Sequence, residues 1–163
     1  EAQNINAIKD DTLEVEIYMK QKTRDLLFEL TVKEGDPDRI SNITGTLSGI
    51  AGSFDLSSQR ICGEAMNTSF PFARTNYKIT AHTRLLGTTG LKQSLRIDLT
   101  FTDGSSQTIE NDLTDLLKNF NDDMPTPMYI TGDLLTPIEA DMTATIVGWG
   151  NGNEENGENI EIY

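Results

Sequence analysis

The chain has one histidine, His82, and one cysteine, Cys62, and these two residue types most often carry nucleophilic or acid–base chemistry. Along its predicted strand, His82 shares the parity of Lys78, Thr80 and Arg84, which is the polar face. A Ser-His-Asp or Cys-His triad needs a histidine within hydrogen-bond reach of its nucleophile. A histidine on a solvent-facing strand therefore argues against such a site. With one residue of each type, the sequence predicts no zinc or copper site and no cofactor.

Cys62 is open to two interpretations. A lone cysteine cannot form an intrachain disulfide, and there is no C-x-x-C pair for metal or redox chemistry. The side chain is either a reactive thiol or a small apolar residue between strands. In both cases stability has to come from the core.

Carboxylates are plentiful, so calcium sites and glycosidase pairs have to be considered. The residues Glu34, Asp36 and Asp38 alternate in a turn, but the frame of a dedicated calcium loop is missing. The pairs Asp122–Asp123 and Glu154–Glu155 are also expected in loops. Solvated turns are the main interpretation, with weak Ca²⁺ binding left open. A glycosidase needs two carboxylates facing each other across a cleft, and no such pair stands out. We therefore predict no catalytic residue, no metal ligand and no enzymatic activity.

The net charge restricts the partners of the protein. Lysine and arginine number 13 against 26 aspartates and glutamates, which gives a formal charge of -13. Nucleic-acid binding depends on clustered cations, and the sequence has no such cluster. An anionic membrane surface would also repel the chain. No apolar stretch of about 18 residues occurs, so no transmembrane segment is expected.

The segment Ser94–Gly104, SLRIDLTFTDG, has the clearest structural pattern in the chain. Its apolar residues alternate with polar ones, which is typical of a strand with one buried face. Asp103-Gly104 then predicts a turn. The residues expected in the core are Leu95, Ile97, Leu99 and Phe101.

Similar patterns recur along most of the chain. They predict an all-β fold: a Greek-key sandwich of about seven to nine antiparallel strands. A short helix is expected near Asp112–Phe120, because apolar residues recur there at helical spacing with Asp112 as N-cap. The further predicted strands are Thr12–Lys20, Thr23–Lys33, Arg39–Leu56, Thr68–Ala73, Tyr77–Leu85, Gln107–Leu113, Met128–Leu134 and Pro137–Val147.

Two of these strands carry special features. Along Arg39–Leu56 the apolar parity changes at Ser48-Gly49-Ile50, which predicts a bulge or sharp bend with Gly49 at the kink. In Thr68–Ala73, Pro71 cannot donate to a strand ladder, which predicts an edge strand. The segment Ser57–Asn67 between them is expected to be a connection.

The expected domain organisation is one sandwich over residues 12–150. Residues 1–11 form a flexible lead, and an acidic, Gly/Asn-rich tail covers 151–163. Within the tail, Asn159–Tyr163, NIEIY, form a short alternating run with Ile160 and Ile162 in phase, and Tyr163 ends it. This run is predicted either to be the last strand of its own sheet or to add to the sheet of a neighbouring subunit.

Four segments in this order resemble the fimbrillin-like family of fimbrial subunits and anchors, from the type V pili of anaerobic Gram-negative bacteria. They are Tyr18–Val32, Arg39–Leu56, Ser94–Leu117 and Ala144–Gly150. The resemblance implies a transthyretin-like sandwich. It also implies that the members of the family are exported lipoproteins with two such domains. These proteins assemble by donor-strand exchange, or they cap and anchor the fibre. The chain has no lipobox cysteine near its start, and Cys62 is no candidate for one. It is expected to hold the C-terminal domain alone, as a processed or truncated product.

The resulting hypothesis is a minor fimbrial subunit or anchor at the outer membrane or in the extracellular fimbrium. Its partners would be other fimbrial subunits, joined by β-strand addition, and a host or bacterial surface ligand. The assembly residues would be Ile160, Ile162 and Tyr163. The alternative is a glycan-binding module of a polysaccharide-uptake system. That function needs exposed aromatic residues in one patch, and the candidates are Tyr18, Tyr77, Tyr129 and Trp149.

Overall fold

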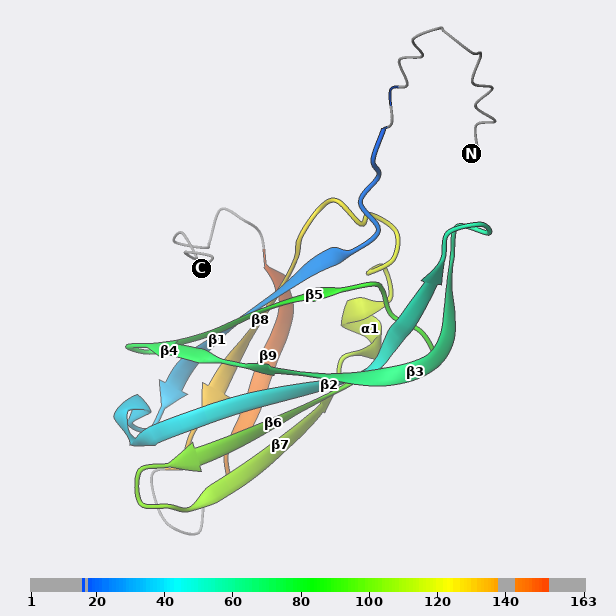
Figure 1. Ribbon diagram of the computed structural model, residues 1–163. Helices are drawn as coiled ribbons and strands as arrows, with labels where there is room; N and C mark the ends of the chain where they lie inside the picture. The colour runs from blue at the N-terminus through cyan, green and yellow to red at the C-terminus, as the bar shows by residue number, and fades with distance from the viewer. Residues whose placement is uncertain (1–15, 17, 138–142, 153–163) are drawn as a thin grey trace, which may run out of the picture.

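Two facing β-sheets enclose the core, as the computed structural model of residues 16, 18–137 and 143–152 shows (Figure 1). One sheet has the strand order β4-β5-β1-β8-β9 and the other the order β3-β2-β6-β7. The predicted all-β sandwich is confirmed. The strands are β1 (Arg24–Glu34), β2 (Ile40–Asp55), β3 (Arg60–Pro71), β4 (Ala73–Thr75), β5 (Lys78–Leu85), β6 (Ser94–Phe101), β7 (Ser106–Asp112), β8 (Met128–Leu135) and β9 (Thr145–Gly152). A 3-10 turn, η1 (Pro37–Arg39), and a short helix, α1 (Thr114–Leu117), complete the described elements.

Strict alternation determines which residues enter the core. In β6 the predicted apolar face is buried, with Leu95 fully inaccessible and Phe101 only 4% exposed. The same holds in β1, where Leu26, Phe28 and Leu30 face inward. Because side chains alternate across a strand, one apolar row from each sheet meets the row of the other.

An aromatic cluster fills the centre of the sandwich. The ring of Phe28 stacks on Phe70 with 5.6 Å between centroids, and Phe72 lies 5.9 Å from Phe28. Gly45 in β2 allows this packing, since a Cβ there would lie 2.7 Å from the Phe72 ring. Phe72 also marks where the chain crosses from one sheet to the other, and its N–H donates to the Ile43 carbonyl at 3.0 Å.

One strand pair departs from the antiparallel prediction. β1 pairs with β5 antiparallel, but it pairs with β8 in parallel, with Leu26 opposite Met128. Tight hairpins force an antiparallel arrangement, whereas a strand that arrives from the opposite sheet is not constrained in this way. The connection from β7 through α1 crosses between the sheets and enters β8 at the end where β1 begins.

The predicted kink in β2 is confirmed. The register with β3 shifts between Leu47 and Ile50, and Gly49 has φ +71, a left-handed conformation that glycine adopts without strain. Ile50 is buried as the parity change predicts. Farther along, however, Gly52 is exposed and Leu56 is 72% exposed. The predicted inward face is wrong there, because β2 has left the sandwich.

The predicted helix Asp112–Phe120 is shorter than expected. α1 covers only Thr114–Leu117, with Leu113 at the N-cap position, and the chain then turns. Asp112 still accepts a hydrogen bond from the Thr114 N–H at 3.0 Å. Leu113, Leu117 and Phe120 are fully buried, so the apolar spacing identifies core residues although it overestimates the helix. Within the described ranges, no helix has the length and apolar content to cross a bilayer.

The predicted ends of three strands also differ. The expected connection Ser57–Asn67 is strand from Arg60 onward, since β3 begins there. The expected strand Pro137–Val147 corresponds to β9, which begins at Thr145 and continues to Gly152; residues 138–142 lie outside the described residues. Of the expected strand Thr12–Lys20, residues 18–20 lie in no strand, with Met19 93% exposed, while 12–15 and 17 lie outside the described residues.

Candidate functional site

His82 lies on the outer face of its sheet, as predicted, and it has a partner that the sequence did not indicate. Its Nε2 lies 2.8 Å from Oδ1 of Asp25 on the neighbouring strand β1. Arg84 also binds Asp25, with Nε at 2.8 Å and Nη2 at 3.2 Å. In the described part of the chain no hydroxyl or thiol hydrogen-bonds to His82. The arrangement is a cross-strand ion-pair cluster, and a nucleophilic triad is not formed.

Because of this cluster, the contribution of Asp25 to the stability of the fold depends on pH. The hydrogen bond from Arg84, followed by that from His82, holds the pKa of the Asp25 carboxyl below its ordinary value of 3.8, against the opposing effect of burial. The ionised carboxylate therefore stabilises the fold above pH 3.8, and this contribution is lost as the pH falls through the lower folded-state pKa.

We expect Asp25→Asn to lower the free energy of unfolding by about 1 kcal/mol at neutral pH, since one partner of a half-buried charged cluster is neutralised. Because wild-type Asp25 is protonated in strong acid, the difference between the two proteins should shrink below pH 3.8. Urea denaturation at pH 7 and pH 3 measures both values. Asp123→Asn serves as the control, because Asp123 has no ion pair among the described residues. A difference that grows in acid would contradict the assignment.

The turn carboxylates are used for local structure. Asp36 accepts the Asp38 N–H at 2.9 Å, and Asp38 forms an ion pair with Arg74 at 2.7 Å. Among the described residues, no group of three or more His, Cys, Asp or Glu side chains could hold a metal ion.

Cys62 is exposed on β3, so its interpretation as a small apolar residue packed between strands is wrong. Its Sγ lies 3.4 Å from the Ser53 hydroxyl of the paired strand. The physical reason is the same as for Leu56: this part of the β2–β3 hairpin lies outside the sandwich.

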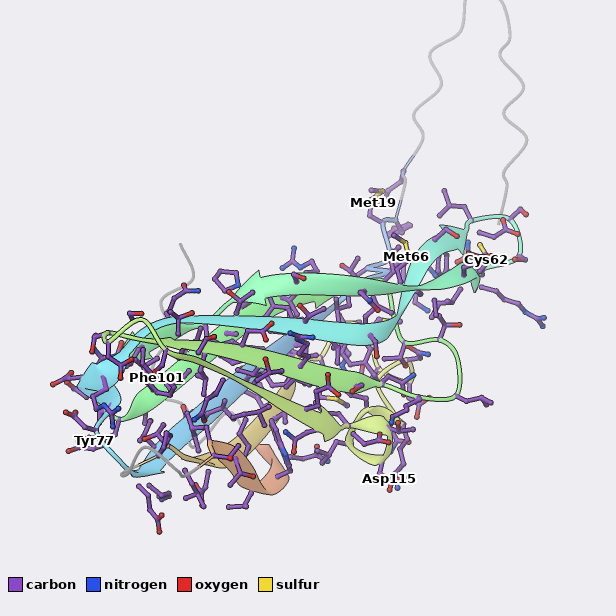
Figure 2. All side chains as sticks on the ribbon, turned by 90° about the horizontal axis from the view of Figure 1, so that it is seen from below. Met19, Cys62, Met66, Tyr77, Phe101 and Asp115 are labelled. Atoms are coloured by element: carbon purple, nitrogen blue, oxygen red, sulfur yellow. The ribbon has the colours of Figure 1, made fainter. Side chains whose placement is uncertain are left out.

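The aromatic candidates for a glycan platform do not share one surface. Trp149 packs against the core, and its Nε1 donates to Asn111 Oδ1 at 3.0 Å. Tyr77 is 60% exposed, but it lies at the opposite end of the molecule from Met19, the neighbour of Tyr18 (Figure 2). The geometry thus gives no support to the glycan-binding alternative.

The sheet edges differ in how far they are covered. On one side of the sandwich, β7 and β9 are bridged by the Trp149–Asn111 hydrogen bond and by the Ala144 N–H, which donates to Gln107 at 2.6 Å. On the other side, β3 and β4 are the outer strands of their sheets, and the chain itself joins them at Phe72. β3 is exposed along nearly its whole length, which makes it the longest uncovered edge in the described structure.

The outer halves of β2 and β3, from Gly49 to Met66, form a hairpin that we call the arm. Pairing of β2 with β6 ends at Leu47 opposite Leu95, so the arm continues without that neighbour. Instead, the Ala51 N–H donates to the Gly87 carbonyl at 2.9 Å. Figure 2 shows Cys62 and Met66 near Met19 at this end of the molecule.

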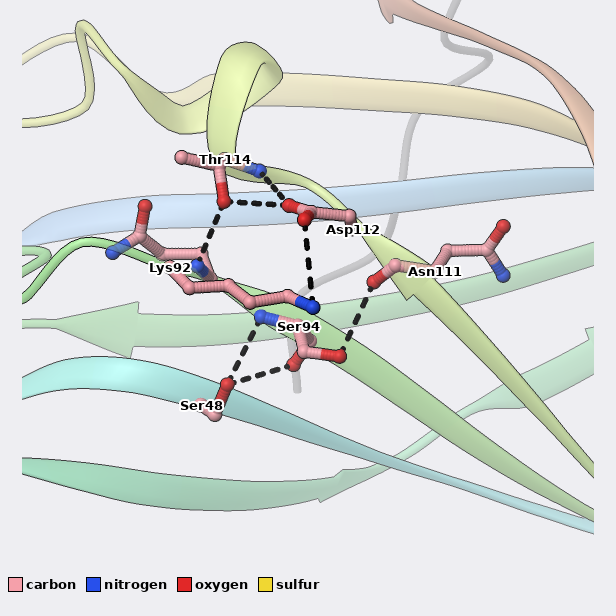
Figure 3. A network of polar contacts seen from close by, with 7 residues as sticks. Ser48, Lys92, Ser94, Asn111, Asp112 and Thr114 are labelled. Carbon is pink, nitrogen blue, oxygen red and sulfur yellow. Dashed lines mark hydrogen bonds and ion pairs between the residues drawn. The ribbon is translucent and has the colours of Figure 1, made fainter.

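A polar network fixes the base of the arm (Figure 3). The Ser48 hydroxyl accepts the Ser94 N–H at 2.9 Å and lies 3.3 Å from the Ser94 carbonyl. Lys92 and Asp112 form an ion pair at 3.6 Å, and Asp112 also accepts from Thr114. These contacts join β2, β6 and the start of α1 directly beside the kink at Gly49.

Between the arm and the body of the protein lies a groove of about 670 Å³, which we call the arm groove. Three segments that are distant in sequence line it: residues 20–22 before β1, the arm itself and the loop 121–125. Sequence reasoning missed this site, because the arm was expected to be buried strand followed by a loop.

The comparisons with known proteins agree with this fold. The family model described as "Fimbrillin-A associated anchor proteins Mfa1 and Mfa2" matches residues 2–160. No curated protein sequence matches significantly. Among solved structures, a candidate adhesin from Bacteroides ovatus is 13% identical with a TM-score of 0.57, covering 85% of this chain and 53% of that one.

A second similar structure is the fimbrial anchor protein Mfa2 from Porphyromonas gingivalis. It is 15% identical with a TM-score of 0.53, covering 80% of this chain and 46% of that one. The chain thus spans about half the length of each of these two proteins, and the likeness to them shows a shared fold. Because the family model covers nearly the whole sequence, the chain belongs to the family of fimbrillin-A associated anchor proteins Mfa1 and Mfa2.

Proposed function

We propose that the protein is a structural minor subunit or anchor of a cell-surface fimbrium, and that it takes part in fimbrium assembly and adhesion without enzymatic activity. The family match over residues 2–160 is the observation that carries this proposal. The proposal includes export of the protein to the outer membrane as part of a lipoprotein. The exposed edge strand β3 is in accord with a role in contacts between subunits.

The proposed mode of association is β-strand addition. An extended segment from one subunit would pair with an uncovered sheet edge of another through backbone hydrogen bonds. In this chain Ile160, Ile162 and Tyr163 are the proposed donor residues. They lie outside the described residues, and the proposal rests on the alternation of Ile160 and Ile162 with polar residues in the sequence NIEIY. Adhesion to a host or bacterial surface ligand would follow from display on the fibre.

We expect deletion of Asn159–Tyr163 to weaken association with another fimbrial subunit about tenfold or more, because the apolar anchors of the donor strand are removed. The free energy of unfolding should change by no more than about 0.5 kcal/mol. Titration calorimetry against a co-expressed subunit and urea denaturation measure the two quantities.

The substitution Asn153→Ser, in the same tail but outside the deleted residues, is the control, since it removes no apolar side chain. If the deletion unfolds the protein instead, the segment is an internal strand and the donor role is lost. If association is unchanged while the fold remains intact, strand donation by this segment is excluded.

A further inference from the structure

Several cations that line the arm groove form no ion pair within the described part of the chain. Most lysines and arginines of the described residues form ion pairs, for example Lys33 with Asp133 and Lys78 with Glu29. Lys20, Lys22 and Arg60, in contrast, are in no ion pair among these residues, and all three line the arm groove. Asp122 and Asp123 also line the groove, from the loop, so three cations face two carboxylates there, in a chain whose formal charge is -13.

The same groove offers apolar surface. Phe54 and Ile61 contribute from the arm, and Met124 and Pro125 from the loop opposite. The ammonium group of Lys22 lies 5.2 Å from the centre of the Phe54 ring, a cation–π contact that holds the lysine at the groove. An occupant with both carboxylates and apolar side chains would therefore match the lining.

The walls of the groove are held in place by direct contacts. The Asn121 side chain makes two hydrogen bonds to the backbone of Thr88, accepting from its N–H at 2.8 Å and donating to its carbonyl at 2.9 Å. Gly87 lies so close to the arm that a Cβ there would be 2.3 Å from Ile61 Cδ1. Because the loop and the arm are both fixed to the segment 87–89, the groove exists before any occupant binds.

We infer that the arm groove binds the chain's own C-terminal segment, residues 153–163. This segment contains Glu154, Glu155, Glu158 and Glu161, and it ends in the apolar run around Ile160 and Ile162. The glutamates would meet Lys20 and Lys22 of the segment before β1 and Arg60 of the arm, whereas Asp122 and Asp123 belong to the loop. The apolar side chains would cover Phe54 and Met124.

The topology makes binding within one chain geometrically feasible. Gly152, the last described residue, pairs with Tyr129, which in turn pairs with Leu27 near the start of β1. Gly152 thus lies at the end of the sheet where residues 20–22 enter it, about 10 Å from β1 by strand spacing. Extended, the segment 153–163 spans about 35 Å, which is ample. Tethering gives it an effective concentration in the millimolar range, so it outcompetes the same segment of a second copy in dilute solution.

Paramagnetic NMR on the full chain tests the inference, because the exposed Cys62 is the only thiol and sits beside Ile61 in the arm. A nitroxide attached there should broaden the amide resonances of residues 153–163 in the wild-type protein. The variant Lys20→Glu/Lys22→Glu/Arg60→Glu should lose this broadening, and 0.5 M salt should reduce it. Lys118→Glu, the matched control, removes an equally unpaired cation outside the groove and should leave the broadening unchanged.

Two outcomes would overturn the inference. One is the absence of broadening in the wild-type chain, or its persistence in the triple variant. The other is broadening that appears only between molecules, when a spin-labelled chain is mixed with an isotope-labelled chain that carries no nitroxide. The measurement uses the isolated subunit, so its result is independent of whether the segment is also donated to another subunit, as proposed above.

Discussion

Phe28→Ala is expected to lower the free energy of unfolding by about 3–5 kcal/mol, since a fully buried aromatic side chain is removed and the cavity can close only in part. Phe28 is 0% exposed and touches both other rings of the central cluster, with centroid distances of 5.6 Å to Phe70 and 5.9 Å to Phe72. Phe70 lies in β3, and Phe72 is the residue at which the chain crosses from β3 to β4 in the other sheet. Loss of Phe28 should therefore loosen the two sheets together, and unfolding should remain cooperative.

Urea denaturation followed by far-UV circular dichroism measures this change. Tyr77→Ala is the control for loss of an aromatic side chain at an exposed position, and it should change stability by no more than about 0.5 kcal/mol. If Phe28→Ala does not fold, the milder Phe28→Leu gives a measurable loss of about 1 kcal/mol. Equal effects of Phe28→Leu and Tyr77→Ala would show that the cluster does not hold the core.

The strands of the sandwich are largely predictable from the sequence because alternation is a local signal. Leu95 to Phe101 follow the pleat without error, and the parity change at Gly49 locates a kink that the positive φ of this residue confirms. Pro71 likewise predicts an edge, and β3 is the outer strand of its sheet. Each of these inferences depends on neighbours within a few residues.

Features that depend on distant segments could not be predicted in this way. The arm alternates like a buried strand, but the pairing of β2 with β6 stops at Leu47 opposite Leu95, and only the three-dimensional arrangement shows that β6 does not continue beside the arm. The parallel pairing of β1 with β8 depends on where the connection from β7 through α1 enters the other sheet, which is at the end where β1 begins. The arm groove combines residues 20–22, 54–61 and 121–125, and nothing in any one of these segments indicates the other two.

For Arg24, the burial of the side chain is predictable from the sequence, but its hydrogen-bond partners are not. It shares the parity of Leu26 and Phe28, so the pattern predicts that it faces inward, and it is only 7% exposed. Nothing in the sequence names its partners. They are backbone carbonyls of the loop before β8: Nε donates to Thr126 at 2.6 Å, and Nη1 donates to Asn119 at 3.0 Å and to Phe120 at 2.8 Å. No acidic side chain among the described residues pairs with this cation.

We therefore expect Arg24→Met to lower the free energy of unfolding by about 2–4 kcal/mol, although methionine retains most of the apolar stem. Carbonyl groups that Arg24 now satisfies would stay buried without a donor, at about 1–3 kcal/mol each where water cannot enter. The cation–π contact with Phe120, at 5.4 Å, would also be lost. Hydrogen exchange should show the largest loss of protection in residues 119–126.

The control Arg96→Met removes an exposed cation whose ion pair with Asp98 stabilises the protein by no more than about 1 kcal/mol. Equal effects of the two substitutions would mean that Arg24 does not organise the loop. If Arg24→Met does melt the loop, Asn121 and Pro125 lose their positions in the wall of the arm groove. Broadening of the C-terminal segment by a nitroxide on Cys62 should then weaken as well, although Lys20, Lys22 and Arg60 are unchanged. The buried arginine would in that case determine the shape of a site that it does not touch.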